Sequence, residues 1–68
     1  MNWAKLAAAL DNESRSLADA ANDPDRPPPM AERLRIASVV LFSLKDCIVH
    51  ALDTNQLNEY RSIMRHGG

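Results

Sequence analysis

The segment that most constrains the fold is a long apolar stretch at residues 29–52. Large apolar side chains recur in it at steps of four and three residues, as they do along one side of a helix. The positions with this spacing are Met30, Leu34, Ala37, Leu41, Leu44, Ile48 and Leu52. Val40 and Cys47 widen the apolar arc on one flank, and Phe42 and Val49 widen it on the other. At about 100° per residue, the arc covers roughly 200° of the helix circumference.

So wide an apolar arc must be covered on more than one side. Residues 2–21 predict a first helix that can cover one of them, because Trp3, Leu6, Leu10 and Leu17 recur at helical spacing in a single narrow seam. Asn2 is a candidate N-cap for this helix. On its opposite face we expect ion pairs between Asp11 and Arg15 and between Arg15 and Asp19, each four residues apart. One apolar side of residues 29–52 is then left without a partner.

The segment 22–29, Asn-Asp-Pro-Asp-Arg-Pro-Pro-Pro, separates the two predicted helices. Proline lacks a backbone N–H and disfavours helix at the residue before it, so this stretch predicts a stiff turn. Pro28 and Pro29 suit the first positions of the next helix. A proline-rich ligand for an aromatic groove is the alternative function of such a stretch, and we favour the connector.

The apolar pattern weakens at residues 53–56 and resumes about a quarter to a third of a turn away, at Leu57, Tyr60 and Met64. Asp53 and Gln56 have the spacing of a capping box. The chain therefore either bends here or begins a third helix. We favour a continuous helix with a bend, because no Gly or Pro intervenes, and we expect it to end at Gly67 and Gly68.

The expected architecture is all-α: one domain, residues 1–68, built as a helical hairpin that pairs into a homodimeric bundle. A chain of 68 residues folds only marginally alone, and its single cysteine, Cys47, excludes an intrachain disulfide. Oligomerisation is the remaining means of stabilisation. An unpaired thiol favours the cytoplasm. The predicted core and dimer residues are Leu34, Val40, Leu41, Phe42, Leu44 and Ile48.

No residue pattern predicts catalysis, a metal site or a cofactor. Cys47 and His50 are three residues apart on one helix, but a metal site needs further ligands, and we read Cys47 as a small hydrophobe. We expect no enzymatic activity. The longest uncharged apolar stretch, Ile36–Leu44, is too short to span a bilayer.

The Tyr, Arg and Met residues near the end of the chain are of types that are enriched at protein interfaces. They predict a partner-binding patch formed by Tyr60, Arg61, Met64 and Arg65. An alternative function is a small dimeric DNA-binding transcriptional regulator. Residues 32–38 alternate polar and apolar like the strand of a ribbon-helix-helix dimer, which would direct Arg33 and Arg35 into the major groove. The net charge of −1 disfavours nucleic acid as the partner.

In size, helix plan and an Ala-, Arg- and Asp-rich composition with the run Asp-Pro-Asp-Arg-Pro-Pro-Pro, the chain resembles small phage-encoded proteins that disable a bacterial host protein. Within that group it is similar to the quorum-sensing anti-activators of Pseudomonas phages. The resemblance implies a non-enzymatic inhibitor in the host cytoplasm. Its expected partner is a LuxR-type transcription activator, with a type IV pilus assembly ATPase as a further possible target.

Overall fold

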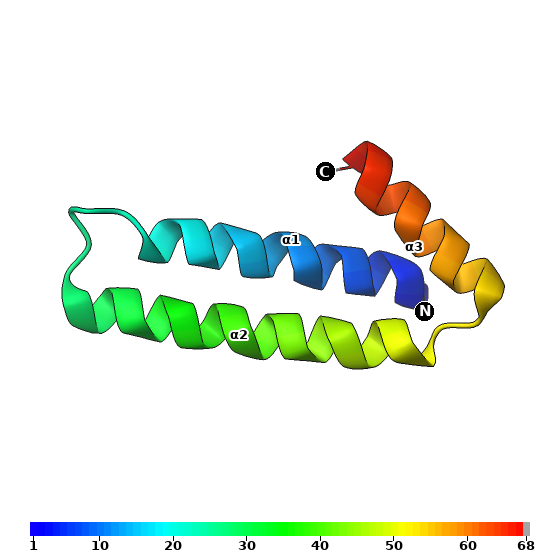
Figure 1. The fold of residues 1–68 in the computed structure, drawn as a ribbon, viewed down its shortest axis with the longest axis horizontal. Coiled ribbons are helices and arrows are strands. Elements are labelled where there is room, and N and C mark those ends of the chain that lie inside the picture. Colours follow the sequence, from blue (N-terminus) through cyan, green and yellow to red (C-terminus); the bar gives the residue numbers. More distant parts are fainter. Residues whose placement is uncertain (68) are drawn as a thin grey trace.

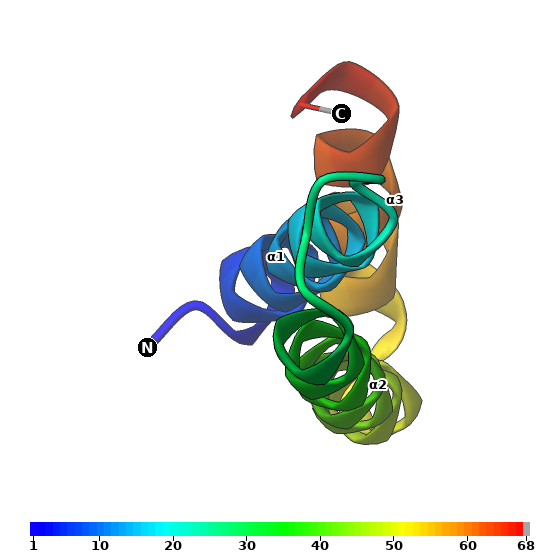
Figure 2. The same cartoon turned by 90° about the vertical axis from the view of Figure 1, so that its left-hand side faces the viewer.

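The computed structural model describes residues 1–67 and consists of three helices: α1 (Trp3–Ala21), α2 (Pro28–Ala51) and α3 (Thr54–Gly67). α1 and α2 form an antiparallel hairpin, and α3 turns back from the end of α2 toward α1 (Figure 1). In the orthogonal view, α1 lies between α3 and α2 (Figure 2). The all-α class and the hairpin are confirmed. Gly68, where the last helix was predicted to end, lies outside the described residues.

Local sequence signals set the ends of α1 and the turn that follows it. The side chain of Asn2 accepts a hydrogen bond from the backbone N–H of Lys5 at 3.0 Å, so the predicted N-cap is confirmed. In the turn, Asp23 Oδ1 accepts from the backbone N–H of Asp25 at 3.0 Å, and Arg26 Nε donates to the Ala20 carbonyl at 3.0 Å. Pro28 opens α2 at its first position, where a missing N–H costs no hydrogen bond.

The buried apolar residues of α1 and α2 are all alanines. Ala4 and Ala7 are fully buried, and the other buried apolar residues are Ala8, Ala21 and Ala31. None of the large side chains in residues 1–67 is fully buried. The leucines that were predicted as the seam of the first helix, Leu6, Leu10 and Leu17, are only half-buried. Small side chains at a helix contact allow a short interaxial distance, and the leucines then flank the contact.

A polar bond also crosses this close contact. Ser38 Oγ on α2 donates to the backbone carbonyl of Ser14 on α1 at 2.7 Å, and Ser14 Oγ donates to the carbonyl of Asp11 at 2.8 Å. A hydroxyl on one helix reaches a carbonyl on its neighbour only where the two backbones are close. The interface is therefore defined by small residues and hydroxyls.

The expected bent helix is wrong, and the alternative of a third helix is confirmed. Leu52 has an extended backbone, with φ −71° and ψ 140°, and ends α2. Asp53 Oδ1 accepts from the backbone N–H of Gln56 at 2.8 Å, while Gln56 Oε1 accepts from the N–H of Asp53 at 3.1 Å. This reciprocal capping box starts α3. It stabilises the break without a Gly or Pro. α3 thus caps the hairpin on the α1 side.

The predicted helix over residues 29–52 is confirmed, and the alternative of a strand at residues 32–38 is wrong, because this segment lies inside α2. In the part of the chain that the structure describes there is no strand. The helical spacing of the apolar residues extends across 28–51. The short alternation of polar and apolar residues at 32–38 therefore does not form a strand.

We predict that Ala7→Leu destabilises the hairpin by about 1–3 kcal/mol, because the added atoms have no space at a fully buried helix contact. Urea unfolding followed by circular dichroism measures the change. Ala9→Leu is the matched control, since Ala9 is exposed on the same helix. Equal effects of the two substitutions would contradict the alanine-centred interface.

Candidate interaction surface

The most prominent surface feature is an apolar face of α2 that no other element covers. We call it the outer face and define it by Ile36, Val39, Val40, Leu44 and Cys47. Ile36 is 58% exposed, Val39 64% and Leu44 50%. α3 lies on the opposite side of α1 (Figures 1 and 2) and so does not shield this face. Single exposed apolar residues are ordinary, whereas a contiguous row marks an interaction site.

The six predicted core and dimer residues divide into two groups on α2. Three of them, spaced by seven residues along one side, are half-buried: Leu34, Leu41 and Ile48. The other three are about half-exposed: Val40, Phe42 and Leu44. The first group belongs to the side that meets α1, so one hairpin covers only part of the apolar arc.

A buried carboxylate connects all three helices. Asp11 on α1 is only 3% exposed. Tyr60 on α3 donates its hydroxyl to Asp11 Oδ2 at 3.2 Å, and Lys45 Nζ on α2 lies 3.6 Å from the same oxygen. Arg15 Nε forms an ion pair with Asp11 Oδ1 at 2.7 Å. The N–H of Arg15 is not aligned for a hydrogen bond, so Oδ1 accepts no hydrogen bond. The predicted pairing of Asp11 with Arg15 is confirmed, but its expected solvent-exposed setting is wrong for Asp11.

Lys45 is the residue in this cluster that sequence reasoning missed. It directly follows the uncharged stretch Ile36–Leu44, where a charged residue is expected to be exposed, yet it is only 8% exposed. Its ammonium group lies 3.9 Å from the ring centroid of Phe42 and 3.9 Å from Asp46 Oδ1. Lysine can bury its aliphatic stem along apolar surface and place its charge against a carboxylate. Lys45 lies on the same side of the helix as Leu41 and Ile48, and this position could have predicted its burial.

The four predicted partner-binding residues do not form one exposed patch. Tyr60 and Met64 are half-buried, whereas Arg61 and Arg65 are exposed. α3 is held to α1 by the Tyr60–Asp11 bond and, nearer the start of α1, by Asn2 Nδ2, which donates to Glu59 Oε1 at 2.9 Å. The side of α3 available to another molecule is therefore basic rather than aromatic.

The environment of Tyr60 favours its neutral phenol. Burial raises the pKa of the hydroxyl above its usual value of 10.0, and the nearby carboxylate of Asp11 raises the pKa further through repulsion and through the hydrogen bond it accepts. A phenolate here would face a carboxylate at hydrogen-bond distance. The attachment of α3 therefore depends on a protonated Tyr60.

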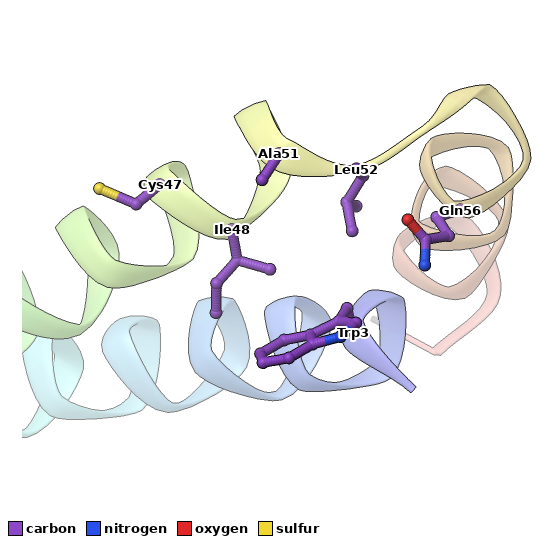
Figure 3. Close-up of a pocket in the computed structure, with 6 residues that line it drawn as sticks. All are labelled: Trp3, Cys47, Ile48, Ala51, Leu52 and Gln56. Carbon is purple, nitrogen blue, oxygen red and sulfur yellow. The ribbon is translucent and has the colours of Figure 1, made fainter. Parts of the chain in front are cut away.

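An apolar pocket of about 300 Å³ lies where the start of α1, the end of α2 and the start of α3 meet. It is lined by Trp3, Cys47, Ile48, Ala51, Leu52 and Gln56. Ile48 and Leu52 point toward the indole of Trp3 (Figure 3). The volume is at the lower limit for small-molecule sites, which also require a few convergent polar groups. Gln56 is the only polar side chain in this lining, and it is engaged in the α3 cap.

The predicted Cys47–His50 neighbours do not converge on a site. Both are exposed, and His50 Nδ1 lies 2.7 Å from the carbonyl of Asp46 in the preceding turn. Within residues 1–67, no group of three His, Cys, Asp or Glu side chains is arranged to hold a metal ion. Among the described helices, none combines the length and the apolarity needed to cross a membrane.

Fold and surface together define a class of protein, the small helical hairpin with a third helix packed on one side and an uncovered apolar face on the other. Comparisons with protein-family models, with curated proteins and with solved structures give no match.

We predict that the phenol of Tyr60 titrates at higher pH in the folded protein than in the urea-unfolded chain. Its contribution to stability is then complete below pH 10 and is lost as pH rises through the folded-state pKa. Tyr60 is the only tyrosine, so ultraviolet absorbance follows it directly. Tyr60→Phe removes the bond to Asp11 and should cost about 1 kcal/mol at neutral pH. Identical titrations in the folded and unfolded states would contradict this environment.

Proposed function

We propose that this chain is a non-enzymatic protein-binding module that acts as an inhibitor of a bacterial regulatory protein and works as a homodimer. The observation that carries the proposal is the outer face of α2, a row of large apolar side chains about half or more exposed. Exposing such a row to water is unfavourable by about 25 cal/mol per Å² of apolar area. A chain that keeps it exposed is typical of proteins that bind others.

The exposed side of α3 supports a second contact region. Arg61 and Arg65 are four residues apart on one face and both are exposed. Like charges at this spacing repel each other slightly, and an acidic partner surface would relieve that repulsion. Arginine is also enriched at protein interfaces because its planar guanidinium donates several hydrogen bonds.

The resemblance in size and hairpin plan to quorum-sensing anti-activators supplies the first candidate partner, a LuxR-type transcription activator. A pilus assembly ATPase is the second candidate. In this proposal the chain reduces the activity of its partner by occupying a surface that the partner needs. No catalytic step is required for such inhibition.

We predict that the chain co-elutes with a purified LuxR-type activator in size-exclusion chromatography and lowers transcription from an activator-dependent reporter. Arg61→Glu should weaken the complex roughly tenfold, because it sets a carboxylate against an acidic surface. Lys5→Glu is the matched control, since Lys5 is also exposed but lies in the first turn of α1, where an acidic residue is tolerated.

The same assay with the pilus assembly ATPase tests the second candidate. Failure to bind either protein, together with an unchanged reporter, would overturn the proposed inhibition. The alternative of a DNA-binding regulator has lost its main support, because the segment with Arg33 and Arg35 is helical and not a strand.

A further inference from the structure

We infer that the outer face of α2 is the surface on which two copies of this chain pair, with the two α2 helices antiparallel and the two-fold axis near residue 41. This inference rests on the proposed function, in which the outer face is an interaction surface, and it goes further by naming the occupant of that face and its orientation. The argument depends on the charges that flank the apolar row.

The molecule has more exposed surface than its mass predicts. Its accessible surface is 4827 Å² for a 7.5 kDa chain, whereas a typical monomer of this mass exposes roughly 4,200 Å². Its radius of gyration is 13.5 Å, against roughly 11 Å for a compact domain of this length. The excess is comparable to the roughly 800 Å² that each partner buries in an ordinary interface. Pairing along α2 would remove much of it.

One pair of opposite charge and one Glu–His pair lie along one flank of the outer face. Arg35 and Asp46 are eleven residues apart, which places them within about 20° of each other around the helix. Glu32 and His50 are eighteen residues apart and have the same angular position to within about 10°. All four residues are exposed. Each pair is too far apart along the helix for its members to meet within one chain.

A two-fold axis perpendicular to α2 makes these residues meet across two chains. In an antiparallel pair, the same flank of each helix faces its counterpart, so Arg35 lies beside the partner's Asp46 and Glu32 lies beside the partner's His50. The midpoint of the first pair falls between residues 40 and 41, and the midpoint of the second falls on residue 41. Both pairs therefore require the same register, which makes the surface self-complementary, as an isologous interface must be.

A parallel pair of α2 helices does not satisfy these charges. It would turn the flank that carries Glu32, Arg35 and Asp46 toward the opposite flank of the other helix. That opposite flank carries Arg33 and Leu44 and has no acidic residue. Like charges across an interface are unfavourable and suppress the wrong arrangement. Charge therefore favours the antiparallel orientation, while the apolar row between the charges supplies the affinity.

The test uses two charge reversals, Arg35→Glu and Asp46→Arg. In a homodimer of either variant, both symmetry-related contacts become repulsive, and self-association should weaken roughly tenfold. In a mixture of the two variants, the heterodimer has Glu beside Arg at one contact and Asp beside Arg at the other. We expect analytical ultracentrifugation to show weakened self-association for each variant alone and recovery of the dimer in the equimolar mixture.

Matched controls separate this effect from a change of net charge or of folding. Lys5→Glu and Asp19→Arg make equivalent charge changes at exposed positions on α1, and they should leave self-association unchanged both alone and when mixed. Circular dichroism of each variant checks that the helices are retained.

Cysteine crosslinking gives an independent readout of orientation. With the axis near residue 41, the two Cys47 residues lie about 18 Å apart along the helices, too far for a disulfide. Oxidation of the native chain should therefore give no covalent dimer, whereas Ile36→Cys should give one by pairing with the partner's Cys47. Fast oxidation of the native chain through Cys47 would indicate a parallel pair and overturn the inference.

Two further results would also overturn it: a folded monomer at 100 μM native chain, or a mixture of variants that associates no better than each variant alone. A monomer that still binds a LuxR-type activator, with binding weakened by Arg35→Glu, would assign the outer face to that partner; the proposed inhibition would then stand and the proposed homodimer would not. A dimer with the expected charge pattern that binds neither candidate would support the inference and contradict the proposed function.

Discussion

The structure depends on the alanine-centred contact between α1 and α2. Because the buried apolar residues of both helices are small alanines, the two backbones can approach closely enough for Ser38 to reach a carbonyl of α1. Large side chains are displaced to the rims of so narrow an interface, where part of their surface remains in water. The hairpin is therefore well ordered in geometry but poor in apolar burial. The third helix adds apolar burial that the hairpin lacks, and the proposed pairing of two copies would add more.

The cluster around Asp11 explains why α3 attaches to α1 and leaves α2 open. A buried carboxylate without partners would be strongly unfavourable. Lys45 approaches it from α2 and Tyr60 from α3, so one side chain of α1 orients both neighbouring helices. The outer face of α2 lies outside this arrangement. The same polar interaction that completes one side of the hairpin leaves the other side free for a partner.

Sequence reasoning located the helices and the turn because their signals are local. The Asn2 cap, the proline turn and the capping-box spacing of Asp53 and Gln56 can each be read from a few adjacent residues. The bend predicted from the absence of Gly and Pro is wrong, because the cap formed by Asp53 and Gln56 stabilises a break without either residue. The burial of Asp11 and Lys45 could not be predicted this way. It depends on how three helices meet, and each residue alone looks like an ordinary surface charge.

The outer face shows where a pattern is ambiguous until the fold is known. From the sequence, Leu34, Val40 and Leu44 all belong to one broad apolar arc, and only the position of α1 divides them into a covered and an uncovered group. Once that division is made, the charges flanking the uncovered group become informative, because Arg35 and Asp46 lie on the same flank but too far apart along the helix to pair with each other within one chain. If two copies supply them, folding and association are linked, and the stability of each hairpin increases with protein concentration. A hairpin centred on alanines can then be marginal alone and stable as a pair.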